Sequence, residues 1–161
     1  MGVISAVAAR GATGDKRTVF CHFYQLIVFF ETTLSFQQSA IYFAPSQVHG
    51  KGVFAARDIE ADEIIEICPV LLLSKTELPY VRQTILDDYY FDWGDSGELF
   101  AICLGYGSLY NHSYEPNAEY GMDFSAQTID FYALKPIAAG EEIFVNYNGE
   151  ADSQEKVWFE D

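Results

Sequence analysis

The sequence predicts a mainly β protein that is built from several small, irregular sheets. Short apolar segments recur along the chain from residue 41, and turn-forming residues separate them at close spacing, which is typical of short strands joined by turns. A hydrophobic content of 50% and an aromatic content of 16% indicate a folded chain rather than a disordered one. The 161 residues suffice for one domain with its own core, and no repeat or linker divides them.

The expected elements follow from the apolar pattern and from the prolines. Pro45 ends the first strand, and Pro69 is expected to break a longer apolar segment into two strands. Residues 74–86 could hold a short helix, which Pro79 limits, and residues 105–110 are expected to form a turn or a short helix. The expected strands span residues 41–44, 53–56, 63–68, 70–73, 89–93, 99–104, 119–122, 128–134 and 142–147.

The chain is expected to divide into an N-terminal extension, residues 1–40, and a domain, residues 41–161. Residues 1–17 are rich in Ala and Gly and weakly basic, which is typical of a flexible tail. Residues 18–30 are apolar and aromatic, but this segment is too short and too interrupted by polar residues for a membrane span. A targeting peptide is the alternative to a packed or disordered extension, although no convincing cleavage site follows.

The net charge of -15 argues against a protein that binds nucleic acid directly, because 24 acidic residues would repel phosphates. A solvated acidic surface explains the charge best, and attraction of a basic, lysine-bearing partner is the alternative.

The cysteines and histidines are scattered, so neither a zinc site nor a disulfide framework is expected. Reduced thiols point to an intracellular protein, cytoplasmic or, in a eukaryote, nuclear. The cysteines are Cys21, Cys68 and Cys103, and the histidines are His22, His49 and His112.

A polar, turn-prone stretch interrupts the apolar chain at residues 105–117, and such a stretch is either a surface loop or a buried site with satisfied polar groups. Residues 111–117, Asn-His-Ser-x-x-Pro-Asn, resemble the central motif of the SET-domain protein-lysine methyltransferases. Residues 50–55, Gly-Lys-Gly-Val-Phe-Ala, resemble the first motif of that family, and residues 140–147, Gly-Glu-Glu-Ile-Phe-Val-Asn-Tyr, resemble its last. Three motifs in the family's order are hard to explain by chance, and the resemblance covers residues 41–161.

The resemblance implies a SET-domain, β-clip-like fold whose C-terminal segment threads a loop as a pseudoknot. It also implies S-adenosylmethionine as cofactor, no metal, no membrane association, and a protein substrate with a basic, lysine-containing segment. Each cofactor residue also has a plainer interpretation: a β-turn at residues 50–52, a satisfied polar pair at residues 111–112, and an exposed anchor of the tail at residue 158. The residues implied to bind the cofactor are Lys51, Gly52, Val53, Asn111, His112 and Trp158.

Tyr147 is the residue to which the resemblance gives the catalytic role, although a tyrosine that ends an apolar strand is more often a packing residue. Methyl transfer needs a neutral lysine amine, whose free pKa is about 10.4, and an aromatic channel favours the neutral form by desolvation. A phenol at the channel end can bind the amine and orient its lone pair. Tyr120 matches a second channel tyrosine, and a cross-strand aromatic is its plainer interpretation.

Two residues depart from the family pattern, since Tyr114 stands where a cysteine is common and Asn146 where an aspartate is common. The chain also lacks the cysteine-rich zinc segment that follows many SET domains. The sequence therefore favours a protein-lysine N-methyltransferase. The alternatives are a non-catalytic SET module that binds a basic partner and a small β domain whose matches are fortuitous. The target lysine, the number of methyl groups and the oligomeric state stay open.

Overall fold

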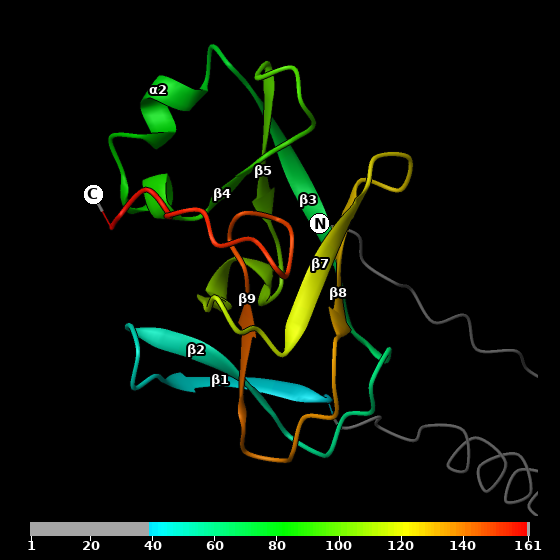
Figure 1. Cartoon of the computed structure of the whole chain (residues 1–161). Coiled ribbons are helices and arrows are strands. Elements are labelled where there is room, and N and C mark those ends of the chain that lie inside the picture. The colour runs from blue at the N-terminus through cyan, green and yellow to red at the C-terminus, as the bar shows by residue number, and fades with distance from the viewer. Residues whose placement is uncertain (1–38, 161) are drawn as a thin grey trace, which may run out of the picture. The chain divides into compact units, whose positions relative to one another are not determined.

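The computed structural model describes residues 39–160, and these form two small sheets with a few short helical turns (Figure 1). The predicted N-terminal extension, residues 1–40, lies outside the described residues apart from its last two. The predicted fold class is confirmed, because the described chain is mainly β and its strands belong to more than one sheet.

The first sheet has four strands in the order β1-β2-β9-β6, and the second has five in the order β4-β5-β3-β8-β7. All neighbours are antiparallel except β6 and β9, which are parallel. Along the chain the elements are β1 (Ile41–Pro45), β2 (Lys51–Ala55), β3 (Ile64–Ser74), α2 (Leu78–Val81), η1 (Ile85–Asp88), β4 (Tyr90–Asp92), β5 (Leu99–Cys103), η2 (Gly107–Leu109), β6 (Asn111–His112), β7 (Ala118–Asp123), β8 (Thr128–Ala133) and β9 (Glu142–Val145).

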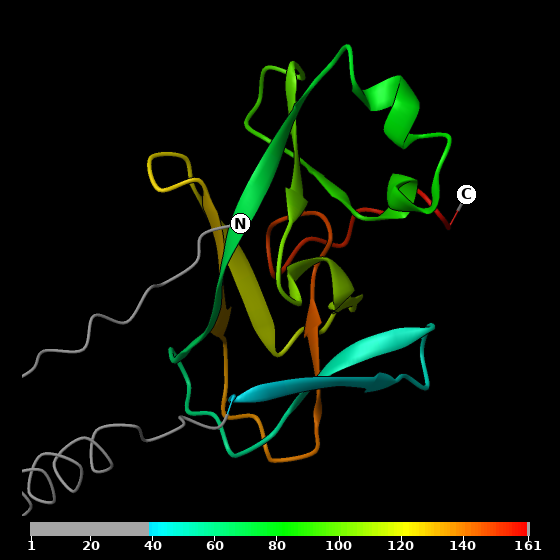
Figure 2. The ribbon, with the colours of Figure 1, turned by 180° about the vertical axis from the view of Figure 1, so that it is seen from behind.

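The predicted break at Pro69 is wrong, because β3 runs without interruption and leads from the end of the unit near β1 and β2 to the end near α2 (Figure 2). Pro69 pairs with Thr128 at the last position of the β3–β8 ladder, and the β3–β5 ladder starts at the next residue, Val70. The missing N–H of Pro69 therefore falls where the strand exchanges one partner for another. The short helix around Pro79 is confirmed, with the proline in the first turn of α2.

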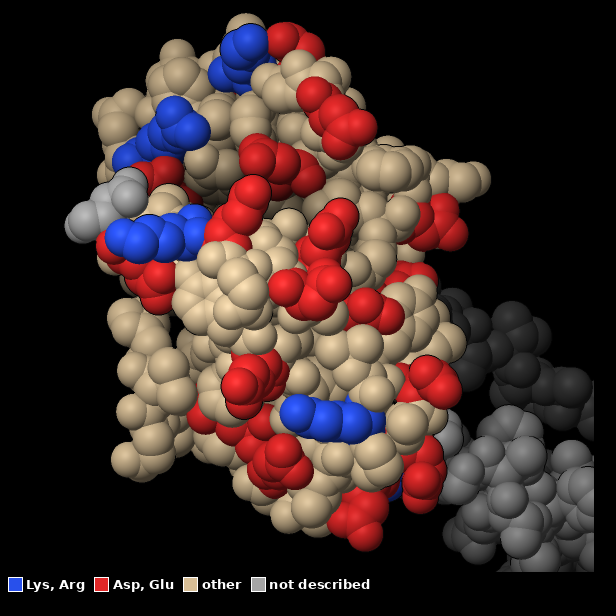
Figure 3. Space-filling model, viewed as in Figure 1, with Lys and Arg blue, Asp and Glu red and all other residues tan. Residues whose placement is uncertain are grey.

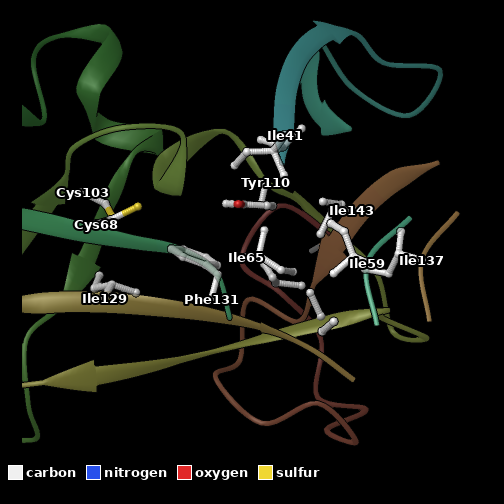
Figure 4. Packing of buried hydrophobic residues seen from close by; sticks show 14 of the residues in the cluster. Ile41, Ile59, Ile65, Cys68, Cys103, Tyr110, Ile129, Phe131, Ile137 and Ile143 are labelled. Carbon is white, nitrogen blue, oxygen red and sulfur yellow. The ribbon is translucent and has the colours of Figure 1, made fainter. Parts of the chain in front are cut away.

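The core lies between the two sheets and draws aliphatic side chains from both (Figure 4). Every second residue of β8 is buried, as expected for a strand with one face on a core. Ile143 of β9 is fully buried, and Tyr110, which follows η2, stacks on Phe131 of β8 with ring centroids 4.4 Å apart. The turn at η2 and the last strand are thus held against the same core.

Candidate active site

Tyr147 lies two residues beyond the end of β9 and is held at both ends by the stretch that precedes β6 and by β6 itself. Parallel pairing sets Asn111 opposite Phe144 and His112 opposite Val145. The backbone N–H of Tyr147 donates to Nδ1 of His112 over 3.1 Å, and its hydroxyl donates to the carbonyl of Tyr110 over 2.8 Å. The central and last motifs, about thirty residues apart in sequence, therefore meet at one tyrosine.

His112 is neutral in this arrangement, because its Nδ1 accepts a hydrogen bond and its proton must lie on Nε2. Burial lowers the pKa of His112 below its ordinary value, and the carboxylate of Glu160 opposes this shift. Nε2 is buried and has no partner among the described residues. The side chain thus positions the backbone of Tyr147 through its Nδ1.

An aromatic cluster surrounds Tyr147 and includes Trp158, which was predicted to bind the cofactor. Trp158 stacks on the Tyr147 ring at 5.6 Å with an interplanar angle of 15°, and Phe159 meets the same ring edge-on at 6.3 Å. The His112 ring meets the edge of Tyr114 at 4.5 Å. Trp158 and Phe159 stay 61% and 57% exposed, so the cluster keeps aromatic surface available for a ligand.

Tyr120 pairs across two strands and also contacts the segment that carries Tyr147. It lies opposite Phe131 in the β7–β8 ladder with ring centroids 5.9 Å apart, so it is a cross-strand aromatic. Its hydroxyl also donates to the carbonyl of Tyr147 over 3.4 Å. Burial raises the pKa of both phenols, that of Tyr147 to about 12, so both stay protonated at pH 7.

A cavity of about 910 Å³ opens in front of these tyrosines. Its inner wall contains Tyr147, Tyr120 and Trp158. Its other walls include residues 87–95, where carboxylates and aromatic rings lie close together in sequence, and residues of η2, β7 and the turn that follows Tyr147. The acidic residues of this wall are Asp87, Asp88, Asp92 and Asp95, and the one basic residue in the lining is Arg82.

The other predicted cofactor residues gather on the opposite side of β6, around Asn111. The buried Asn111 amide donates to Oε1 of Glu142 over 2.8 Å and to the carbonyls of His49 and Lys51 over 3.2 and 3.3 Å. A Cβ at Gly52 would overlap the Glu142 carboxylate, so a larger residue there would require this carboxylate to move away from Asn111.

Lys51 and Val53 flank this glycine, and neither side chain reaches the aromatic cluster. The Val53 side chain is fully buried in the core, so only its backbone is available to a ligand. The Lys51 amine lies over the ring of Phe43, 5.0 Å from its centroid. The predicted cofactor residues thus form two groups, one on each side of β6.

The two departures from the family pattern both anchor the C-terminal segment. The Asn146 amide donates to the Ser153 carbonyl over 2.8 Å, and its Oδ1 accepts the N–H of Asn148 over 3.1 Å. An aspartate could only accept, so the asparagine makes one bond more. The Tyr114 hydroxyl donates to Glu160 over 2.6 Å and accepts the N–H of Val157 over 3.3 Å.

The sequence prediction missed Tyr110 and Glu142. Tyr110 acts through its carbonyl, and no side-chain pattern identifies a residue that acts through its backbone. Glu142 looked like one of two acidic residues before an apolar strand, and only the fold shows that it faces Asn111 and Gly52.

Within residues 39–160 no group of three or more His, Cys, Asp or Glu side chains is arranged to hold a metal ion. No helix in that range has the length and apolar character that a membrane span requires.

Comparisons with known proteins agree with this geometry. The SET-domain family model matches residues 50–148, which include all three motifs. A histone-lysine N-methyltransferase of Schizosaccharomyces pombe, described as specific for lysine 37 of histone H3, is 36% identical over 113 residues, which are 70% of this chain and 71% of that protein.

Solved structures show the same likeness. A Plasmodium falciparum protein solved as a candidate histone methyltransferase is 32% identical, with a TM-score of 0.59 over 76% of this chain and 99% of its own. The Polycomb Repressive Complex 2 of Chaetomium thermophilum, solved in an autoinhibited conformation with S-adenosylmethionine, has a TM-score of 0.60 at 26% identity, over 68% of this chain and 15% of that one.

Proposed function

The chain belongs to the SET-domain family, whose methyltransferases use S-adenosylmethionine, and on this premise we propose that it transfers the methyl group of that cofactor to a lysine side chain of a protein substrate. One observation supports the proposal most directly. The hydroxyl of Tyr147 lies in the wall of an aromatic cavity and is oriented by a bond to the Tyr110 carbonyl.

The residues around β6 fit the chemistry of the cofactor, which combines a flat adenine ring with cationic ammonium and sulfonium groups. The exposed faces of Trp158 and Phe159 suit a planar ring. On the other side of β6, no salt bridge among the described residues engages the Glu142 carboxylate, which suits a cationic group. When bound, the cofactor supplies an activated methyl group on its sulfonium sulfur.

Tyr147 would act on the lysine amine as a hydrogen-bond acceptor. Its own proton points to the Tyr110 carbonyl, so the lone pairs of its oxygen are free to accept an N–H of the amine. Such a bond fixes the amine and leaves the nitrogen lone pair free for the incoming methyl group. With its pKa raised to about 12, the phenol stays neutral at pH 7 and does not serve as a base. Where the rings of Tyr147, Tyr120 and Trp158 surround the amine they would desolvate it, which favours its neutral form.

The substrate we propose is a basic segment that contains the target lysine. Four aspartates lie in the cavity wall, and among residues 39–160 only Asp87 of these four forms a salt bridge, with Arg82 at 3.8 Å. Asp and Glu also spread over the face shown in Figure 3, where Lys and Arg are few. Each exposed charge pair contributes only about 0–1 kcal/mol and weakens with salt, so the attraction would be collective and salt-dependent. Histone H3 is the first substrate to test, because it is named for the fission-yeast relative.

The proposal is tested by incubating the full chain with methyl-labelled cofactor and a histone mixture, followed by mass spectrometry of the products. We expect label on a lysine, and no label above background with Tyr147→Phe at short times. Label on another residue type would refute the lysine assignment. Calorimetry with S-adenosylhomocysteine separates the alternatives: no binding at millimolar ligand refutes the cofactor site, whereas binding without transfer favours a non-catalytic SET module.

A further inference from the structure

Glu66 does not line the cavity, but it makes two hydrogen bonds that hold Tyr110 in place. The carbonyl of Tyr110 is the acceptor for the Tyr147 hydroxyl. Its Oε1 accepts the backbone N–H of Tyr106 over 3.1 Å, and its Oε2 accepts the hydroxyl of Tyr110 over 3.3 Å. Tyr106 directly precedes η2 and Tyr110 directly follows it. One carboxylate therefore holds both ends of this three-residue helix.

The fold makes room for this carboxylate and aims it. The β3–β8 register shifts between Ile64 and Glu66, and such an irregularity redirects a side chain. Gly105 has a φ of +77°, and a Cβ there would overlap Oε1 and lie 3.4 Å from Cδ of Glu66. A glycine is thus needed at residue 105 for its backbone conformation and for the space that Glu66 takes.

The hydroxyl of Tyr110 depends on Glu66. Tyr110 is 2% exposed and its ring is stacked on Phe131, so without the carboxylate its hydroxyl would be buried with no partner among the described residues. Burial and the neighbouring carboxylate both raise the pKa of Tyr110, so the phenol remains a donor. The carbonyl of this same residue accepts the hydroxyl of Tyr147 over 2.8 Å.

We propose that Glu66 is a positioning residue, which fixes the carbonyl of Tyr110 and through it the direction of the Tyr147 hydroxyl. The inference rests on the proposed function, because the Tyr147 oxygen can accept from a lysine amine only while its proton is directed elsewhere. If η2 shifts, the Tyr110 carbonyl moves with it, and the Tyr147 proton is free to turn toward the amine and compete for its lone pair.

Two substitutions of Glu66 distinguish the loss of its hydrogen-bonding side chain from the loss of its charge. Glu66→Ala removes both acceptors. Glu66→Gln keeps one acceptor for the Tyr106 N–H and brings an NH₂ that can donate to the Tyr110 oxygen, but the Tyr110 proton loses its acceptor, so it should rescue only in part. Tyr110→Phe removes only the Oε2 contact and keeps the stacked ring. Glu98→Ala is a matched control, since it removes an exposed carboxylate that lies just before β5 and is paired with Lys75.

The kinetic test is a double-mutant cycle between Glu66→Ala and Tyr147→Phe, with transfer to one histone-derived lysine peptide at saturating cofactor. Glu66→Ala should lower kcat by about tenfold to a hundredfold, as misplaced catalytic groups do. On the Tyr147→Phe background it should change kcat by no more than about twofold, since its effect passes through the missing hydroxyl. Effects that multiply, or an equal loss of S-adenosylhomocysteine affinity, would show a general structural role and overturn the proposal.

A spectroscopic test needs no substrate. In protein labelled with ¹³C at the ζ-carbon of tyrosine, the Tyr147 signal is identified by its absence from Tyr147→Phe. It should move in Glu66→Ala and Tyr110→Phe, move less in Glu66→Gln, and stay in Glu98→Ala. If Glu66→Ala does not fold, Tyr110→Phe decides the matter. An unmoved Tyr147 signal in folded Glu66→Ala or folded Tyr110→Phe overturns the role of Glu66, whereas a moved signal in a protein that methylates no lysine refutes only the proposed function.

Discussion

Replacement of Tyr147 by phenylalanine tests the centre of the proposed chemistry with the loss of a single oxygen atom. The ring would keep its stack on Trp158 at 5.6 Å and its contact with His112 at 5.2 Å. The backbone N–H would still donate to Nδ1 of His112. Only the 2.8 Å bond from the hydroxyl to the Tyr110 carbonyl disappears.

The expected loss of stability is smaller than the expected loss of rate. One such hydrogen bond contributes about 0.5–1.5 kcal/mol to the free energy of unfolding. For a unit of this size that lowers Tm by a few degrees. Removal of one positioned polar group from a transition state costs about a hundredfold in rate, or about 2.7 kcal/mol. Methyl transfer should therefore fall by more than the change in stability can explain.

The assay measures three quantities on the wild type and the variant side by side: Tm, S-adenosylhomocysteine affinity, and the initial rate of label transfer to a histone-derived lysine peptide. Tm should drop slightly, affinity should change little, and the rate should drop about a hundredfold. If Tyr147→Phe transfers methyl groups at nearly the wild-type rate, the tyrosine is a packing residue and the proposed mechanism is wrong.

Three further predictions concern other parts of the site and the fold. Tyr120→Phe should change how many methyl groups are added, because its hydroxyl lies in the cavity wall; an unchanged product distribution by mass spectrometry would contradict this. Protonation of His112 removes the Nδ1 acceptor, and its folded-state pKa is lower than the unfolded value of about 6.5. The free energy of unfolding should thus fall as the pH drops below about 6.5, in a step that His112→Gln lacks. A chain that begins at Ser39 should fold and bind S-adenosylhomocysteine, because it keeps the Ala40 carbonyl that accepts the Ala56 N–H over 2.8 Å; insoluble protein would count against the predicted domain.

The strands of the fold could be predicted from sequence because each depends on its own few residues. The strand expected at residues 128–134 and the short helix limited by Pro79 depend on local signals, and the structure shows both. Pro69 was misjudged because its effect depends on which strand lies beside it. The two-residue strand β6 has no pattern of its own and exists only through its parallel partner β9.

The residues of the candidate site also fall into two groups, those that the sequence could identify and those that it could not. Tyr147, Tyr120 and His112 could be named because side chains of a known motif identified them, and the structure brings them together. Glu66 and Tyr110 could not be named. Tyr110 holds the Tyr147 hydroxyl through its backbone carbonyl, and Glu66 reaches the backbone of Tyr106 from an irregular position in β3. Such contacts depend on backbone direction, which the type of a residue does not encode.

The central place of β9 has a consequence for synthesis of the protein. β9 is the last strand in the chain, yet it lies between β2 and β6 inside its sheet. A ribosome would have released β2 long before its partner existed, and until then one edge of β2 would stay unpaired. Contacts between residues so distant in sequence form slowly. Any nascent chain or stop mutant that ends before Glu142 would therefore lack the strand that joins β2 to β6 and, with it, Tyr147. Chaperones and proteases would then meet a chain with an unpaired strand edge.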